Sequence, residues 1–343
     1  INTSGNGTVY TTVSGTTDSY SSAGIDADGN ISILGGNITI AQSGTGSKGI
    51  SADGKLTFGD SSHSPEVKIT TTGNRFLVSG TNGSATAVYA KPKCIKSDGT
   101  LTVINGIFTL STQNPGSSCF DSNGTLTISG GTGELTVGGN QSKGLTASGT
   151  ITMNGGSYSI NTLGGAELET LGSGYDPAYC KAINSDSDVN IGGSNITITS
   201  SGAGGKGISS DTSINMTSGI LKITTSGSGT TYKNASGTTD SYSASCFSAP
   251  NINVVGGSVV ASSSGNGGKG FKADTSVKIG DSSNSPSVTI TTTGAKFIVS
   301  GSDYCHPKAI VSDGSVTINN GTTTISSSDD GIHAEKNYTQ NGG

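Results

Sequence analysis

The fold is decided by a repeated stretch, of which Lys48-Gly49-Ile50-Ser51-Ala52-Asp53-Gly54 is one copy and Lys93-Cys94-Ile95-Lys96-Ser97-Asp98-Gly99 another. A second short run follows each copy, Leu56-Thr57-Phe58 in the first case and Leu101-Thr102-Val103 in the other. Apolar and polar residues alternate within these runs, which is the two-residue period of a β-strand. Self-similarity of this kind is typical of a solenoid.

The repeat extends along the whole chain. Three short strands with Asp-Gly or Gly-Gly corners fit between successive apolar anchors, and strands stacked in register lie about 4.8 Å apart. The sequence therefore predicts an all-β fold, a right-handed parallel β-helix (solenoid) of about eleven coils with three short strands per coil. No segment has a helical period. The anchors are Ile25, Ile50, Ile95, Phe120, Leu145, Ile183, Ile208, Phe247, Phe271, Ile310 and Ile332.

We predict a single β-helix domain over residues 1–343 that grew by internal duplication. Residues 14–21 recur as 236–243, and residues 59–65 recur as 280–286, so coils 1–3 resemble coils 8–10. Several insertions enter at one point of the coil, between its last strand and the next anchor. Because they share a register, they should form a wall along one edge. The insertions lie near residues 2–22, 72–92, 164–180, 227–245 and 292–307.

The composition limits the classes of function. Hydrophobic residues make up 30% of the chain, but the net charge is only −5, and disorder usually combines low hydrophobicity with high charge. Basic and acidic residues are sparse and mixed, so we expect no nucleic-acid partner. No apolar run approaches the roughly 18–20 residues that would span a membrane. We expect a monomer.

The chain ends suggest a secreted protein. Residues 1–4 have neither the basic start nor the apolar core of a signal peptide, and residues 340–343 stop where the repeat requires another strand. We expect a longer polypeptide whose export signal has been lost, and a location outside the cell or on a bacterial cell surface. The five cysteines are too few for a disulfide scaffold. Cys94 and Cys119 share a column of neighbouring coils and are predicted to form a disulfide.

One register, two residues before the anchor, holds seven of the seventeen lysines. In an acidic protein such a stripe of cations would attract a polyanion. In the alternative interpretation each lysine binds loop carbonyls or an insertion carboxylate. The predicted lysine ligands of a bound molecule are Lys93, Lys143, Lys181, Lys206, Lys269 and Lys308, in line with Lys48.

Eight of the ten tyrosines lie in the insertions. They either pin the loops to the body or offer flat, amphipathic faces to sugar rings, and Tyr175, Tyr179 and Tyr304 are the candidates for sugar contact. The residue just before each anchor is always Gly, Ala or Cys, so a positive φ is not the shared requirement. We expect an insertion or a ligand to pass close to the backbone there.

Carboxylates of the insertions and of the last coil are candidate calcium ligands, since Ca²⁺ takes 6–8 oxygen ligands. They are Asp18, Asp176, Asp240, Asp303 and Asp330. The three histidines share no ligand spacing, and the chain has no nucleophile elbow, Cys/His metal knuckle or phosphate loop. No catalytic residue is assigned.

Three motifs carry a resemblance: Lys-Gly-Ile-x-Ala-Asp-Gly-x-Leu-Thr from Lys48, Lys-Ala-Ile at Lys181 and Lys308, and Asp-Asp-Gly-Ile-His-Ala at residues 329–334. Over essentially its whole length the chain resembles a family of secreted or surface bacterial carbohydrate-binding β-helix proteins, similar in shape to pectate lyases. The resemblance implies calcium-dependent binding of acidic plant polysaccharide, such as the polygalacturonate of pectin, without established catalysis. The lysine register and Asp330 carry the match.

Three functions remain open. The first is a non-catalytic module that binds uronic-acid polysaccharide, assisted by calcium. The second is a calcium-dependent polysaccharide lyase with Lys181 or Lys308 as its base, although a carboxylate beside the base would raise its pKa, the wrong direction. The third is a cell-surface adhesin or structural rod that binds neither glycan nor metal.

Overall fold

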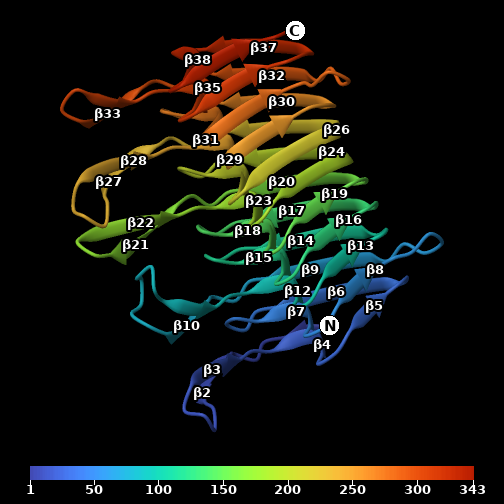
Figure 1. Ribbon diagram of the computed structural model, residues 1–343. Coiled ribbons are helices and arrows are strands. Elements are labelled where there is room, and N and C mark those ends of the chain that lie inside the picture. Colours follow the sequence, from blue (N-terminus) through green and yellow to red (C-terminus); the bar gives the residue numbers. More distant parts are fainter.

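The structure, a computed structural model that describes residues 1–343, consists of strands and contains no helix. Twenty-nine strands belong to one large sheet, and the other ten form five two-stranded hairpins. The strands stack along one axis from the N-terminal to the C-terminal end (Figure 1). No helix is present that would be long and apolar enough to cross a membrane.

One turn of the stack contains β7 (Lys48–Ala52), β8 (Leu56–Phe58) and β9 (Glu66–Thr71). The next turn repeats it with β12 (Lys93–Ser97), β13 (Leu101–Val103) and β14 (Ile107–Thr112). Each strand pairs in parallel with its counterpart in the turn before, in register, so that Ile95 lies beside Ile50 and Leu101 beside Leu56. The predicted all-β class and the parallel solenoid are confirmed.

The other strands take the same three places. The first strands, whose outer side we call the first-strand face, also include β4 (Ala23–Ala27), β15 (Ser118–Ser122), β18 (Lys143–Ala147), β23 (Lys181–Ser185), β25 (Lys206–Ser210), β35 (Lys308–Ser312) and β38 (Asp330–Ala334). Two long strands, β29 (Ser245–Val254) and β31 (Lys269–Ile279), continue from the first into the second place. The remaining second strands are β5 (Ile31–Ile33), β16 (Leu126–Ile128), β19 (Ile151–Met153), β36 (Ser315–Ile318) and β39 (Asn337–Gln340).

The third strands form another outer surface, the third-strand face. Its members, besides β9 and β14, are β1 (Asn2–Thr3), β6 (Asn37–Gln42), β17 (Thr132–Val137), β20 (Ser157–Thr162), β30 (Ser258–Ser263), β32 (Ser287–Thr292) and β37 (Thr322–Ser327). Two long strands, β24 (Val189–Ser200) and β26 (Ser213–Thr225), occupy both the second and the third place.

A single apolar core fills the inside of the solenoid and comprises 54 buried residues. The anchors Ile95 and Phe120 are fully buried, whereas the terminal anchors Ile25 and Ile332 are only partly covered. Phe247 and Phe271, on neighbouring turns, pack edge to face with ring centroids 4.5 Å apart. Aromatic pairs of this geometry stabilise the stack beyond the area they bury.

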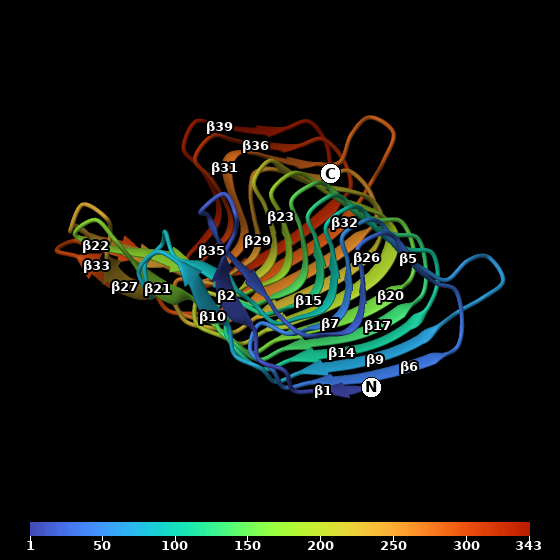
Figure 2. The same cartoon turned by 90° about the horizontal axis from the view of Figure 1, so that it is seen from below.

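Five antiparallel hairpins leave the solenoid on one side and form what we call the hairpin wall (Figure 2). One hairpin lies within each of the five segments identified above as insertions. Neighbouring hairpins contact one another, and a strand bridge joins Ser84 to Thr170. The hairpins are β2 (Thr8–Thr11) with β3 (Thr17–Tyr20), β10 (Phe76–Ser79) with β11 (Val88–Ala90), β21 (Glu167–Leu171) with β22 (Gly174–Ala178), β27 (Thr230–Lys233) with β28 (Thr239–Tyr242), and β33 (Phe297–Ser300) with β34 (Asp303–Cys305).

The predicted disulfide between Cys94 and Cys119 is wrong, because all five cysteines are free thiols. The sulfur of Cys94 lies 3.4 Å from the carbonyl oxygen of Ser111, and that of Cys119 lies 3.7 Å from the carbonyl oxygens of Leu110 and Thr136. The two thiols are therefore directed at backbone acceptors inside the core.

The column of small residues also has another cause than the one predicted. A Cβ added at Gly144 would lie 2.5 Å from the carbonyl oxygen of Ala182 and 2.6 Å from Cγ2 of Ile160. Gly49 is crowded in the same way by Cys94 and Ile69. The residue is small because the next turn and the core approach it, and the atoms that crowd Gly49 and Gly144 do not come from a hairpin.

Candidate functional site

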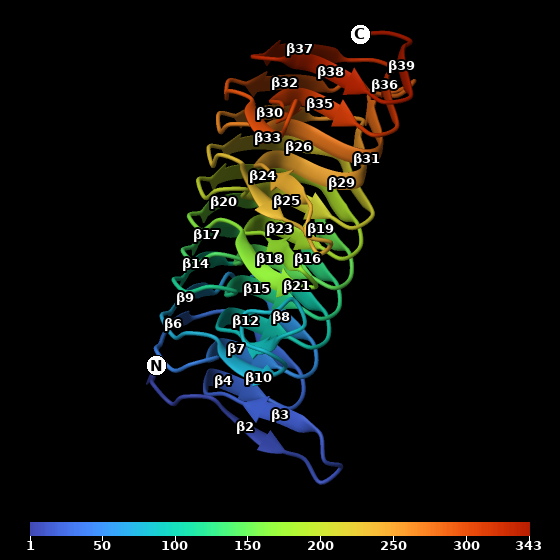
Figure 3. The same cartoon turned by 90° about the vertical axis from the view of Figure 1, so that its left-hand side faces the viewer.

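The lysine register forms a ladder on the first-strand face. Lys48 pairs with Lys93, Lys143 with Lys181, Lys181 with Lys206, and Lys269 with Lys308. Ser118 and Ser245 interrupt the ladder, and Asp330 closes it beside Lys308. The hairpins project beside this face, in front of the first strands in the view of Figure 3.

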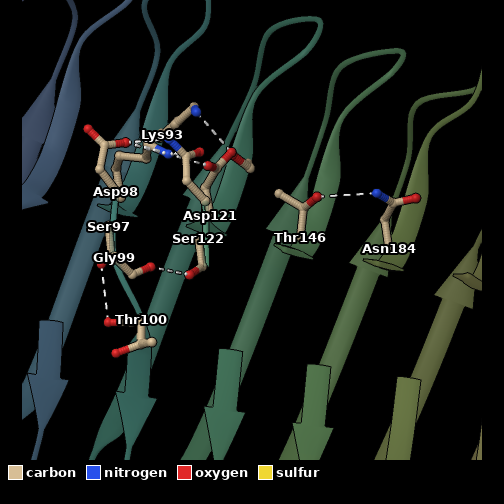
Figure 4. Close-up of polar contacts among 12 residues, drawn as sticks. Lys93, Ser97, Asp98, Gly99, Thr100, Asp121, Ser122, Thr146 and Asn184 are labelled. Atoms are coloured by element: carbon tan, nitrogen blue, oxygen red, sulfur yellow. Dashed lines mark hydrogen bonds and ion pairs between the residues drawn. The ribbon is translucent and has the colours of Figure 1, made fainter. Parts of the chain in front are cut away.

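Near the N-terminal end the ladder joins a partly buried ion network (Figure 4). Lys93 Nζ lies 3.0 Å from Asp121 Oδ2, and Lys96 Nζ lies 3.2 Å from Asp121 Oδ1 and 2.9 Å from Asp98 Oδ1. Burial alone would raise the pKa of Asp121, but Lys93 and Lys96 together outweigh it and lower that pKa to about 2. Asp121 therefore stays ionised and holds two cations in place.

A second column of outward-facing residues lies on the first strands, three residues after the lysine register, and it was not predicted from the sequence. It includes Lys96, Asp121, Thr146 and Asn184, which are register neighbours on successive strands. Asn184 donates a hydrogen bond of 3.3 Å to the Thr146 hydroxyl (Figure 4). The signal for this column was present, since an outward residue follows each lysine at the same spacing.

Most lysines toward the C-terminal end are held by the protein itself. Lys181 donates to Asn184 Oδ1 at 2.7 Å, and Lys206 donates to the carbonyl of Ser243 at 2.7 Å. Lys269 donates to the carbonyls of Gly267 and His306, and Lys308 Nζ lies 3.3 Å from Asp330 Oδ2. In this part of the ladder the alternative interpretation, in which lysines bind loop carbonyls or carboxylates, describes the contacts.

Lys206 is the most enclosed of these cations. Its Nζ lies 4.5 Å from the centre of the Tyr179 ring, and Tyr179 packs edge to face on Tyr242. Burial, and next to it the charge of Lys272, lowers the pKa of Lys206 to about 7. Burial also raises the pKa of the Tyr179 phenol above its usual range. Tyr179 thus pins a hairpin to the body.

Two adjoining cavities open at the other end of the ladder. The first, of about 220 Å³, is lined by polar and charged residues, among them Lys91, Lys93, Lys143 and Asp121. The second, of about 190 Å³, shares Lys91 and Lys93 and adds Lys48, Tyr89, Lys96 and Asp98. We call the two together the lysine cleft. Five lysines and two aspartates line it, a local excess of positive charge in a chain of net charge −5.

Lys91, like Lys96, is a cation of this cleft that was not predicted from the sequence, because it precedes the ladder by two residues. Its carbon chain lies against Gly116, where an added Cβ would be 3.2 Å from Cδ of Lys91. Its ammonium group takes part in none of the ion pairs or hydrogen bonds of the structure. Burial, and then the charge of Lys143, lowers the pKa of Lys91 to about 8.

Gln141 fastens two hairpins beside the cleft. It accepts a hydrogen bond of 2.7 Å from Arg75, at the start of one hairpin, and donates to Glu169 in the next. Arg75 also pairs with Glu167. Gln141 is the one non-glycine residue with a positive φ, at 61°, a conformation that costs energy and persists where the surroundings enforce it.

The other predicted sugar contacts lie on the hairpin wall. Tyr175 is exposed on β22. The ring of Tyr304, on β34, lies 4.6 Å from the ammonium of Lys296 and beside the His306 ring. Neither tyrosine lines the lysine cleft.

The five predicted calcium ligands are not brought together. Asp18 accepts a hydrogen bond of 3.0 Å from Tyr10, Asp240 accepts one of 3.4 Å from Tyr232, and Asp330 pairs with Lys308. Asp176 and Asp303 lie on two further hairpins. Nowhere in the chain do three His, Cys, Asp or Glu side chains form a group that could hold a metal ion.

Comparison with known proteins gives one family. Searches among curated proteins and among solved structures found no match to the chain. A family model described as carbohydrate-binding domain-containing protein matches residues 73–229 and again residues 176–343. The two overlapping matches span residues 73–343, well over half of the chain, and include most of the lysine cleft. The chain belongs to this family of carbohydrate-binding domain-containing proteins.

Proposed function

We propose that this protein is a non-catalytic binding module for acidic polysaccharides, polymers of uronic acid such as the polygalacturonate of pectin, and that it binds them in the lysine cleft. The observation that carries the proposal is the excess of five lysines over two aspartates around the two adjoining cavities. A cleft lined by one sign of charge concentrates ligands of the opposite sign. The family match supports carbohydrate as the ligand class.

Within the cleft we assign the leading role to Lys91. Its ammonium has no partner in the protein, so a ligand carboxylate would form a charge-assisted hydrogen bond without displacing an existing one. Lys93, in contrast, is neutralised by Asp121. Lys143, whose Nζ lies 3.5 Å from the carbonyl of Gln141, is the second available cation. Ser118 and Ser122 line the same cavity, but their hydroxyls already donate to Asp121 and to the carbonyls of Gly99 and Thr125, so we assign them no contact with the sugar.

The test is a calorimetric titration with oligogalacturonates, in which Lys91→Gln and Lys143→Gln are each compared with the wild type. Lys222→Gln is the matched control, because Lys222 is an exposed lysine on the third-strand face, away from the cleft. We expect the two cleft variants to weaken binding about tenfold, as loss of a charge-assisted contact should. Wild-type protein that binds no uronic-acid polymer would refute the proposal and favour an adhesin or structural rod.

Calcium assistance is a separate hypothesis. The acidic side chains named from the sequence lie on separate hairpins and on β38, and they are not gathered into one group. We therefore assign no contact between the protein and the polysaccharide to a calcium ion. Repeating the titration with calcium and with a chelator tests the hypothesis directly, and equal affinities in the two conditions would reject it.

A second candidate, a polysaccharide lyase, is favoured by the environment of Lys181. Burial, and then the charge of Lys143, lowers the pKa of Lys181 to about 8, closer to the range of a general base. Incubation with polygalacturonate, followed by ultraviolet detection of unsaturated uronide, separates a lyase from a binding module. Absence of product from a protein that binds the polymer would support the module.

We also propose that the solenoid is a right-handed β-helix of eleven turns, a single domain that arose by duplication, and that it works as a monomer outside the cell or on a bacterial surface. Parallel strand crossovers are right-handed in nearly all proteins, which supports the hand. Mass determination in solution tests the monomer, and fractionation of the source cells tests the location.

A further inference from the structure

A cavity separate from the lysine cleft lies on the third-strand face. It has a volume of about 340 Å³, within the range of small-molecule sites. Strands β14, β17 and β20 form it, and in Figure 2 β14 and β17 lie along the lower side of the solenoid, whereas the hairpins project to the left. It is lined by Ile107, Phe108, Thr109, Thr132, Gly133, Glu134, Ser157 and Ser159.

Two outward rows and one inward row build this cavity. The outward rows are Ile107, Thr132 and Ser157, and Thr109, Glu134 and Ser159, each in register across the three strands. Between them, at inward positions, lie Phe108 and Gly133. The strands are about 4.8 Å apart, so the cavity extends about 10 Å along the solenoid axis, room for two pyranose rings.

Gly133 is the one glycine in an inward row otherwise filled by branched or aromatic side chains and one threonine. The ring of Tyr158 takes the space of the missing side chain, since an added Cβ at Gly133 would lie 2.5 Å from its Cδ1. Tyr158 is buried, and its hydroxyl donates a hydrogen bond of 2.9 Å to the carbonyl of Gly130. The floor of the cavity is therefore packed and held in place.

The rim of the cavity offers unused polar groups. The hydroxyls of its two threonines and two serines, and the carboxylate of Glu134, take part in none of the hydrogen bonds or ion pairs within the protein. Ile107 is 52% exposed at the edge and presents an apolar surface. A sugar ring matches this combination, because its hydroxyls donate to a carboxylate and accept from hydroxyls while its C–H face packs on an apolar side chain.

We infer that this cavity is a second carbohydrate site, and that it binds a neutral saccharide, two pyranose rings of a chain that runs along the solenoid axis. Glu134 is the only charged group that lines it, and a carboxylate repels uronic acids. The site therefore selects against the ligand proposed for the lysine cleft. The inference stands on the third-strand face alone and does not depend on the acidic-ligand proposal.

The test titrates the protein with four neutral tetrasaccharides: cellotetraose, xylotetraose, mannotetraose and maltotetraose. We expect at least one to bind, and Ile107→Ser and Glu134→Gln each to weaken that binding about tenfold, as loss of one charge-assisted or apolar contact should. Ile220→Ser is the matched control. Ile220 occupies the same outward row four strands further on and is 56% exposed, but it does not line the cavity.

Three results would overturn the inference: no binding of any of the four, binding that both cavity variants leave unchanged, or displacement by oligogalacturonate. Lys91→Gln distinguishes the two sites, because it should leave neutral binding intact. A protein that binds a neutral tetrasaccharide but no uronic acid would retain this site and lose the proposed function of the cleft.

Discussion

Lys93 and Asp121 face each other across two neighbouring strands, with Nζ 3.0 Å from Oδ2, and both side chains are largely shielded from solvent. The pair neutralises one lysine of the ladder, so that Lys91 and Lys143 are the cations available to a ligand. The pair is a diagonal contact, because the register partner of Lys93 is Ser118 and Asp121 lies three residues further along that strand, beside Lys96. The first prediction concerns this pair.

Asp121→Asn should destabilise the fold by about 2 kcal/mol, because it removes the one carboxylate that pairs with the shielded Lys93 and one of the two that pair with Lys96. Urea denaturation measures the loss. The control is Asp274→Asn, since Asp274 lies 3.9 Å from Lys272 and both side chains are about half exposed. An exposed pair contributes little, so the control should change stability by less than about 0.5 kcal/mol. Equal losses in the two variants would contradict the assigned role of Asp121.

Binding of an acidic glycan should weaken as the pH rises through about 8. Lys91 carries a charge below its lowered pKa of about 8 and loses it above that value. The free energy of unfolding, in contrast, should increase as the pH rises. The unfolded chain keeps its lysine proton up to a pKa of about 10.4, so deprotonation favours the folded state between these two values. Titrations at pH 7 and pH 9 measure the affinity.

Lys91→Arg is the matched variant for this pH dependence. An arginine stays charged over the whole range, so its binding at pH 9 should equal its binding at pH 7. A wild-type affinity that is the same at both pH values would show that Lys91 does not contact the ligand charge.

Gly144→Ala should cost about 2 kcal/mol, because its new Cβ would meet the Ala182 carbonyl and the Ile160 side chain inside a packed core. Gly29→Ala is the control, since nothing lies within 4 Å of an added Cβ at Gly29. Thermal unfolding compares the two variants. A tolerated Gly144→Ala would show that the column is small for a reason outside the core, such as a ligand.

Arg75→Gln should release one hairpin from the next without loosening the solenoid. The substitution removes the charge that pairs with Glu167 and weakens the contact with Gln141. Hydrogen exchange at Ala85, whose amide donates to the carbonyl of Thr170 at 3.0 Å, should accelerate. Exchange at core amides such as that of Ile95 should not change. If exchange at Ala85 stays slow in the variant, the contact between Ala85 and Thr170 holds the two hairpins together without the help of Arg75.

The repeat was sufficient to predict the strands, their stacking and the lysine ladder, because each depends on register and register repeats in the sequence. The prediction failed where contacts depend on which side chains meet inside the core. The small column looked like a binding floor, yet its glycines are set by isoleucines of the third strands, such as Ile69 and Ile160. In the turns that contain Cys94 and Cys119, the register position of these isoleucines is occupied by Leu110 and Leu135.

The cleft could be predicted only in part. Lys93 and Lys143 follow from the register, but Lys91 lies in the segment that leads out of a hairpin, where no repeat applies. The pairing of Lys93 with Asp121 was missed because it depends on side-chain reach across two strands. A lysine is free to bind a ligand only where no side chain or carbonyl of the protein pairs with it. These partners cannot be identified from the pattern of charges along the sequence.

The contacts between hairpin tips have a mechanical consequence. Ser84 is bridged to Thr170, and the amide of Ser173 donates to the carbonyl of Ala235 at 2.9 Å, so residues from turns far apart in the stack are tied outside the solenoid. A pull along the axis must break these lateral ties as well as the ladder bonds between turns. The wall thus acts as a brace, and a protein anchored at one end while holding a polymer would resist tension better than its strands alone allow.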